Sequence, residues 1–231
     1  MFNQLDSFEN VKDIVTLRLK NEHSFSSEEY TSDYIGDIRI GYAIPVDSLD
    51  EEMKNAINVK VNEHSKDVIG AAIRILKPMV DKWGIGEKEL YDAALKNTIR
   101  QNKAEYATLE DMVMSMMFSH SLNFVTRSSI LDLKTEPNKQ VVVTNKDKYY
   151  GAVIMLDHFA MDEISEYFNG NFYIIPSSTN EIIVVGVDVL HADSIVSMVK
   201  EINTTIVDEK DLLSNHLYEY DSVAEKVVVV A

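Results

Sequence analysis

Ser177, Ser178 and Glu181 share one short loop, and their types and spacing suit chemistry better than any other group in this chain. A serine becomes a nucleophile when a base lies within hydrogen-bond reach, and Glu181 could be that base. Further polar candidates for a binding site lie elsewhere in the C-terminal half: Asn145, Tyr150 and Asn203. Hydroxyls that follow a proline more commonly hydrogen-bond their own backbone. The sequence therefore favours a structural loop over a catalytic one and identifies no catalytic residue.

Other kinds of catalytic or cofactor site find little support in the residue pattern. The six histidines are scattered, with no H-x-x-x-H or H-E-x-x-H pair, so a dedicated zinc site is not expected. The absence of cysteine excludes disulfides and thiolate chemistry. No complete glycine-rich phosphate-binding motif occurs. We therefore expect no metal and no cofactor, and we favour a protein that is not an enzyme.

The charge of the chain is strongly negative and unevenly distributed. The formal net charge is −16 at pH 7, and residues 136–231 carry 16 acidic residues against 6 basic ones. Such a surface repels phosphate backbones, so direct binding of nucleic acid is not expected. The simpler interpretation is that the negative charge favours solubility. The more specific alternative is an acidic surface that imitates nucleic acid toward a basic partner. No signal peptide and no apolar run of about 18 residues occur, which predicts a cytoplasmic protein without a membrane contact.

The candidate loop lies within a segment, residues 149–185, that contains several predicted elements. In chain order the pattern predicts a buried strand over 153–156, a helix from Asp157 to Asn169, and a hairpin of strands 172–175 and 182–185. Asp157 can cap the helix with its carboxylate, and Asn169-Gly170 can end it. The order is therefore β-α-β-β, with loop 176–181 between the last two strands.

Two segments in the N-terminal part allow two interpretations each. Residues 7–20 place apolar side chains at helical spacing, but Val15, Leu17 and Leu19 also alternate. We predict a helix there and keep a strand as the alternative. Residues 66–82 form either one helix or a strand over 71–76 followed by a short helix that begins near Pro78. Because proline inside a helix costs about 3 kcal/mol, we favour the second interpretation.

The remaining elements are predicted from hydrophobic periodicity and capping residues. They are a strand over 38–44, a helix after a capping box at 48–51, helices over 87–100, 109–118 and 191–203, a strand over 141–144, and an edge strand over 217–220. The methionines of 109–118 could form an adaptable binding groove, but at helical spacing they are more often core. The apolar tail 227–231 is expected to pair with a sheet edge.

Together these elements predict an α+β fold with mixed or antiparallel sheets and packed helices. The C-terminal half would form a β-β-α-β-β-α unit. The loop over 119–139 is the best candidate for a boundary between an N-terminal α+β region, 1–135, and an acidic C-terminal α+β region, 136–231. One continuous domain is the alternative, since 231 residues suit either arrangement.

Two groups of residues carry a family resemblance. The first is Lys82-Trp83-Gly84-Ile85 with Glu89-Leu90-Tyr91, Ala94-Leu95 and Asn97-Thr98. The second comprises Thr144-Asn145, Tyr150-Gly151-Ala152, residues 172–178, Glu181, Glu201-Ile202-Asn203, Leu213-Ser214, Tyr218 and Tyr220-Asp221. On these residues the chain resembles, over about 82–221, a bacterial family of domains of unknown function, the one numbered 5688. A fainter similarity covers residues 8–44.

The resemblance implies no established activity, and it is consistent with a gene carried by a phage or another mobile element. Family members commonly carry a histidine where this chain has Asn180, so a mechanism that used that histidine as a base does not apply here. The family's usual N-terminal section has no counterpart in this sequence. The chain is therefore expected to be a shortened relative.

We therefore expect a cytoplasmic, non-enzymatic protein that binds another protein. One alternative is an acidic inhibitor that imitates nucleic acid toward a basic host or defence protein. The other is a small hydrolase or ligand-binding enzyme that uses the 176–181 loop, with Glu181 as base. A concave pocket under that loop would favour the enzyme, whereas a convex acidic face would favour the binding protein.

Overall fold

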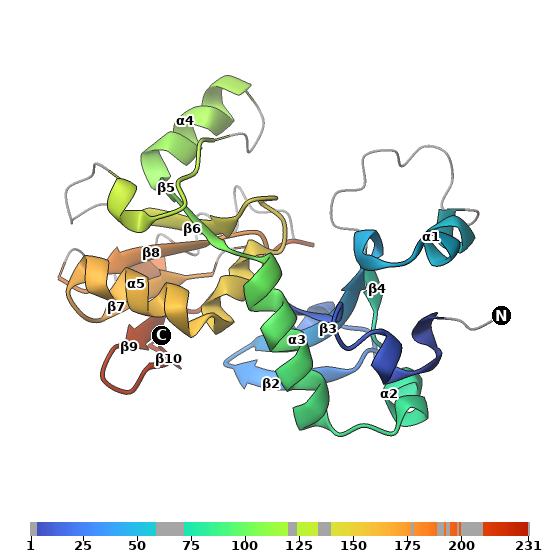
Figure 1. Ribbon diagram of the computed structural model, residues 1–231. Helices are drawn as coiled ribbons and strands as arrows, with labels where there is room; N and C mark the ends of the chain where they lie inside the picture. The colour runs from blue at the N-terminus through green and yellow to red at the C-terminus, as the bar shows by residue number, and fades with distance from the viewer. Residues whose placement is uncertain are drawn as a thin grey trace.

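The computed structural model describes residues 4–58, 72–119, 124–133, 140–176, 178–188, 192, 195–197, 199 and 210–230. Over these residues the chain forms two antiparallel sheets with helices packed against them, which confirms the predicted α+β fold. Figure 1 shows the four-stranded sheet on the right and the six-stranded sheet on the left, with α3 (Glu87–Gln101) running along both.

The first sheet is built around β3 (Ile38–Pro45), which was predicted from its alternating pattern. The other strands are β1 (Thr16–Asn21), β2 (Thr31–Ile35) and β4 (Ala72–Arg74). Strand β1 pairs along one side of β3, and β2 and β4 pair with the other side. The predicted helix over 7–20 is wrong beyond a single turn, Phe8–Asn10. The segment with alternating Leu17 and Leu19 forms a strand instead, because pairing with β3 buries both side chains.

Three helices flank the first sheet. Helix α1 (Glu51–Asn58) begins as predicted, but its cap is Asp50, whose Oδ1 accepts the Met53 N–H at 2.8 Å, and not Ser48. Helix α2 (Lys77–Trp83) has Pro78 in its first turn, which confirms the strand-then-helix interpretation. Helix α3 fixes the start of β1, since the Leu17 N–H donates to Thr98 Oγ1 at 2.8 Å.

The second sheet has the strand order β10-β9-β7-β8-β6-β5. Its strands are β5 (Ala104–Thr108), β6 (Val141–Asn145), β7 (Phe172–Ile175), β8 (Ile182–Gly186), β9 (Tyr218–Asp221) and β10 (Lys226–Val229). The predicted hairpin is β7 and β8, and the apolar tail pairs with β9 as expected. Strand β9 is not an edge strand, because β10 covers it. Strand β5 comes before the predicted domain boundary at residue 135 and β6 comes after it, and the two strands pair. The division into domains stays a prediction.

Residues 153–156 were predicted as a strand, and this is wrong. They belong to η6 (Gly151–Leu156), a 3-10 helix. The run is buried, as a strand would be, but β6 already pairs directly with β8, so no strand position is left between them. The helix that follows, α5 (His158–Phe168), is confirmed with its cap, because Asp157 Oδ1 accepts the Phe159 N–H at 3.1 Å. Asn169 ends α5 in the left-handed conformation.

The second sheet is buried on both faces. Val141 and Val143 point into the larger core, which continues under α3, α5 and the first sheet, and Val142 points into a smaller core on the opposite face. The predicted helix 191–203 falls mostly outside the described residues. Those that are described there are helical, and Ile195 and Val199 pack in the smaller core. Among the described helices none is long and apolar enough to cross a membrane.

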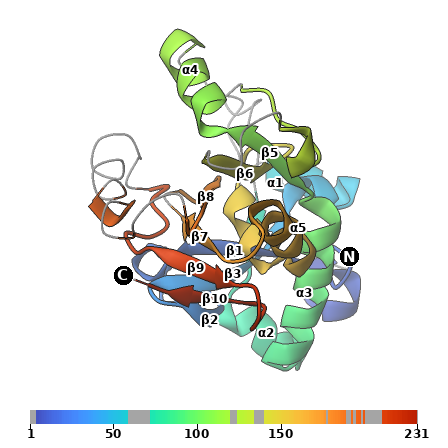
Figure 2. The same cartoon turned by 90° about the vertical axis from the view of Figure 1, so that its left-hand side faces the viewer.

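Helix α4 (Leu109–Ser119) forms as predicted, but its methionines are not all core. Met112 packs against the smaller core, whereas Met114 is 49% exposed and Met117 is 66% exposed. Their neighbours Val113 and Phe118 are also exposed. Figures 1 and 2 show α4 projecting away from the second sheet, so the helix has fewer neighbours among the described residues than its apolar pattern suggested.

Gly151 provides a test of the packing around η6. A Cβ at this position would lie 2.4 Å from the Asn180 carbonyl oxygen and 2.5 Å from Thr144 Oγ1. We expect Gly151→Ala to lower the free energy of unfolding by about 1–3 kcal/mol because backbone must move. Gly86→Ala is the matched control, since a Cβ there meets nothing within 4 Å. Urea unfolding of both variants checks this, and equal stabilities would contradict it.

Candidate functional site

The residues predicted in the 176–181 loop form a buried hydrogen-bonded pair. Ser178 Oγ donates to Glu181 Oε1 at 2.7 Å, and both residues are less than a tenth exposed. Burial raises the pKa of Glu181, despite the hydrogen bond from Ser178. Ser178 Oγ also accepts the Asn180 N–H at 2.9 Å, so the pair fixes the shape of the loop. Ser177 and Asn203 lie outside the described residues.

Of the other two predicted residues, Asn145 is the last residue of β6 and Tyr150 lies in the turn that follows. Asn145 Nδ2 donates to the Tyr149 carbonyl at 2.9 Å, and the Tyr150 N–H donates to Asn180 Oδ1 at 3.2 Å. Tyr150 adopts a φ of 53°, a left-handed conformation that is uncommon for a bulky residue. Such strain persists only where the surroundings impose it, and it is frequent at ligand sites. The loop and the turn together therefore hold Tyr150 in one place.

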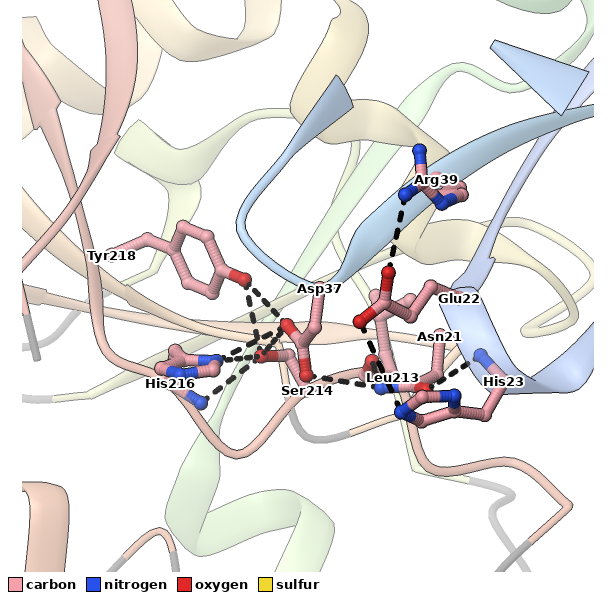
Figure 3. Close-up of polar contacts among 9 residues, drawn as sticks. All are labelled: Asn21, Glu22, His23, Asp37, Arg39, Leu213, Ser214, His216 and Tyr218. Atoms are coloured by element: carbon pink, nitrogen blue, oxygen red, sulfur yellow. Dashed lines mark hydrogen bonds and ion pairs between the residues drawn. The ribbon is translucent and has the colours of Figure 1, made fainter. Parts of the chain in front are cut away.

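A second polar cluster joins a serine and a histidine to an aspartate that lies far from them in the sequence, and the three were not predicted to meet (Figure 3). Asp37, between β2 and β3, accepts from Ser214 Oγ at 2.6 Å and from the Tyr218 hydroxyl at 2.9 Å through Oδ1. His216 Nδ1 lies 3.2 Å from the same oxygen. Partial burial alone would raise the pKa of Asp37, but the bonds from Ser214, Tyr218 and His216 outweigh it and lower the pKa.

This cluster does not have the geometry of a nucleophilic triad. In a triad the imidazole lies between the serine and the aspartate and takes the serine proton. Here Ser214 donates directly to Asp37, and Ser214 is fully buried. Asn21 at the end of β1 also joins the cluster, because its Nδ2 donates to Asp37 Oδ2 and to the Leu213 carbonyl. We therefore identify the cluster as a junction that fastens the first sheet to the segment before β9.

A hollow of about 170 Å³ lies over the first sheet beside Tyr150, and we call it the basic pocket. Its lining residues come from β1, β3, β4, the segment between β1 and β2, and the turn before η6. They are Arg18, Lys20, Phe25, Glu29, Gly41, Tyr42, Ala43, Ala72, Arg74 and Tyr150. The basic pocket is therefore the place where the first sheet meets the turn that the 178–181 loop supports.

The sheet register explains why the hollow exists and why it is basic. Arg18 pairs with Gly41 and Arg74 pairs with Ala43, so both arginines lie on the same face as these two small residues. Lys20 lies two residues beyond Arg18 and shares that face. Gly41 leaves the centre of the hollow without a side chain, and a Cβ there would lie 2.5 Å from the Phe25 ring.

Arg18 is the most unusual residue of the basic pocket. Its Nε is buried and has no hydrogen-bond partner among the described residues. Its guanidinium lies 4.5 Å from the centre of the Tyr150 ring, a cation–π contact. Burial raises the pKa of Tyr150 to about 12, so the ring is a neutral phenol near pH 7 and not a counter-ion. Arg18 thus carries a positive charge, with its Nε buried, that the ring only partly compensates.

Lys20, Arg74 and Glu29 complete the charges of the basic pocket. Arg74 Nη1 lies 2.9 Å from Glu29 Oε1, and the Ser26 N–H also donates to Glu29. Burial lowers the pKa of Lys20; Glu29 opposes this shift, whereas Arg74 and Arg18 add to it. The basic pocket therefore contains positive charge in excess, inside a chain whose net charge is −16.

The family model of a family of unknown function, DUF5688, matches residues 2–222. The chain belongs to the DUF5688 family. Neither a comparison with curated proteins nor one with solved structures found a match. DUF5688 is a family of unknown function, so membership assigns no chemistry to the basic pocket.

The basic residues of this DUF5688 protein were missed because of the helix predicted over 7–20. In a helix, Arg18 and Lys20 would point in different directions, whereas in a strand they share a face. The alternation of Leu17 and Leu19 was the signal that placed both cations on the polar side. Arg74 carried no such signal, because its place beside Ala43 depends on the pairing of β4 with β3.

The junction around Asp37 gives a pH-dependent prediction for this DUF5688 protein. Asp37→Asn should lower the free energy of unfolding by about 1–3 kcal/mol near neutral pH, because charged hydrogen bonds are lost. The lowered pKa means that the carboxylate stabilises the fold above its usual pKa, and that this contribution disappears as the pH falls through the folded-state value. The two unfolding curves should therefore converge below about pH 4.

Asp33→Asn is the matched control for this experiment, because Asp33 belongs to the same hairpin but its side chain is 91% exposed. It should change stability little at any pH. Urea unfolding across the acid range provides the comparison. If the free energies of unfolding of wild type and Asp37→Asn differed by the same amount at every pH, the charge of Asp37 would not be what stabilises the junction.

Proposed function

We propose that this protein is a non-enzymatic binding protein that holds an anionic group in the basic pocket. The observation that carries the proposal is the Nε of Arg18, which is buried and has no hydrogen-bond partner among the described residues. A buried donor without a partner costs about 1–3 kcal/mol. An oxyanion that accepts from the guanidinium would remove that cost and neutralise the charge.

The electrostatic setting supports an anion as the ligand. The surface of a chain with a net charge of −16 repels small anions in general. The basic pocket is a local exception, since Arg18, Lys20 and Arg74 line it together with one acid, Glu29. Charges of one sign in a concave site with apolar walls focus the field and attract the opposite charge.

The residues that line the basic pocket favour binding over catalysis. A general base works best with a pKa near the working pH. Hydrogen bonds from Ser26 and Arg74 lower the pKa of Glu29 despite burial, and burial raises the pKa of Tyr42 and of Tyr150 to about 12. The hydrolase hypothesis for the 176–181 loop has less support, because Ser178 and Glu181 are buried and bonded to each other.

Arg18→Met tests the proposal. Inorganic phosphate at millimolar concentration and constant ionic strength should raise the midpoint of thermal unfolding of the wild type, because a ligand that binds only the folded state stabilises it. The variant should lose this shift, since it lacks the buried donor. Each variant is compared with its own midpoint in the absence of phosphate, so a change in intrinsic stability does not affect the result.

Arg127→Met is the control for a general loss of positive charge. Arg127 is exposed and lies outside the basic pocket, beside β5 of the second sheet. This variant should keep the full phosphate shift. A wild type that phosphate does not stabilise, or an Arg18→Met variant that keeps the whole shift, would contradict the proposal.

The exposed apolar face of α4 supports a second function, the binding of a partner protein. Val113, Met114, Met117 and Phe118 lie at spacings of one, four and five residues, which places them on one side of the helix. Their exposed fractions run from 44% to 77%. Methionine-rich helix faces adapt to differently shaped partners. A cytoplasmic location, carriage by a mobile element and imitation of nucleic acid by the acidic surface stay predictions.

Met117→Glu tests this second function. In pull-downs from the native cell with tagged protein, the variant should lose a partner that the wild type retains, because a charge on the apolar face opposes its burial. Retention should survive high salt if the contact is apolar, whereas an acidic imitation of nucleic acid would lose its partner in salt. Val223→Glu is the control, since Val223 is 93% exposed between β9 and β10. Equal loss in both variants would contradict a role for α4.

A further inference from the structure

The charges that line the basic pocket do not cancel. Arg74 is paired with Glu29, the one acid among the described residues that line the pocket. Arg18 and Lys20 have no carboxylate within ion-pair distance among the described residues. The described lining residues therefore carry two more positive charges than negative ones. A ligand that balances them carries two negative charges and not one.

The cations approach the hollow from different sides. Arg18 and Arg74 rise from β1 and β4, which lie on opposite sides of β3. Because neighbouring strands are about 4.8 Å apart, these two strands are roughly 10 Å apart. Lys20 lies about 6.6 Å from Arg18 along β1. Donors in three directions match the three terminal oxygens of a tetrahedral phosphoryl group, whereas a carboxylate presents two oxygens in one plane.

Two aromatic rings form apolar walls beside these donors. Tyr150 covers one side of the Arg18 guanidinium at 4.5 Å, and Lys20 Nζ lies 5.3 Å from the centre of the Phe25 ring. Each ring removes water from one side of a cation and leaves its remaining N–H groups for an acceptor. The hollow measures about 170 Å³, and a cavity of roughly 150 Å³ can hold a benzene ring. A phosphoryl group, which is smaller than that ring, therefore fits inside the hollow.

We infer that the ligand of the basic pocket is a small phosphomonoester in its dianionic form, with Arg18, Lys20 and Arg74 as donors to the phosphoryl oxygens. This inference rests on the proposed function, because it specifies the charge and the shape of the anion. Arg18 is fixed beneath Tyr150 and orients the phosphoryl group. Arg74, whose side chain is 62% exposed, is able to turn from Glu29 toward it. The organic group lies between Phe25 and Tyr150.

Three probes that share one ring separate charge from shape: phenyl phosphate, phenyl sulfate and benzoate. At about pH 8 phenyl phosphate is a dianion, since the second pKa of a phosphomonoester is about 6. Phenyl sulfate is tetrahedral with one charge, and benzoate is planar with one charge. Isothermal titration calorimetry of the full chain should show phenyl phosphate binding at least about tenfold more tightly than phenyl sulfate, as expected for one more charged contact. Benzoate should bind most weakly.

Two variants change the charge of the basic pocket in opposite directions. Lys20→Met removes one positive charge and should reduce the preference for phenyl phosphate over phenyl sulfate to about threefold or less. Glu29→Gln removes the one acid and should tighten the binding of phenyl phosphate severalfold. The glutamine oxygen can still accept from Ser26 and Arg74, so the local structure is kept. A residue with a merely structural role would not tighten binding when substituted. Lys103→Met, at an exposed position just before β5 of the other sheet, is the control and should leave all three affinities unchanged.

The outcomes distinguish this inference from the proposed function. Equal affinity for the three probes would contradict the inference that the ligand is a dianion, but it would agree with the proposed anion-binding pocket. Binding of none of them to the wild type would overturn both. Weaker binding of phenyl phosphate to Glu29→Gln would also contradict the inference that excess positive charge selects the ligand, because the Glu29 carboxylate would then be contributing to binding.

Discussion

The Asp37 carboxylate is the constraint on which the arrangement of the two sheets depends. It accepts hydrogen bonds from Asn21 of the first sheet, from Tyr218 of the second sheet and from Ser214, which precedes β9. Figure 2 shows β9 and β10 lying beside β2 and β3 at this junction. The basic pocket needs that arrangement, because Arg18 belongs to the first sheet whereas Tyr150 follows β6 of the second. A junction that loosened would separate the cation from the ring that covers it.

The basic pocket works against the stability of the fold that contains it. Arg18 has a buried nitrogen without a partner, Tyr150 is in a left-handed conformation, and Lys20 is deprived of solvent beside two arginines. Each of these features is unfavourable, and the proposed anion would offset the two that involve charge, at Arg18 and Lys20. Local conflicts of this kind are expected at functional sites, since packing alone would select apolar residues there.

The sequence predicted the elements whose signals are local. The β7–β8 hairpin, α3, the cap of α5 at Asp157 and the pairing of the tail all follow from short patterns of apolar, capping and turn residues. The two errors in the type of secondary structure, at 7–20 and 153–156, have one physical cause. In both segments the apolar spacing fits two structures, and the choice depends on which strands find partners in the finished sheets. Met114 and Met117 were predicted as core because periodicity shows which residues share a face but not whether anything covers it.

The candidate site was harder to predict than the fold, and the reason is its construction from distant parts of the chain. Asn145 and Tyr150 were identified, but as companions of a loop serine and not as the supports of a cation. Arg18 and Arg74 meet only through β3, so no short motif connects them. The loop of Ser178, Asn180 and Glu181 does contribute, because Asn180 holds the backbone of Tyr150. The polar loop and the basic pocket are therefore parts of one structure, in which the loop positions the ring and the ring covers the arginine.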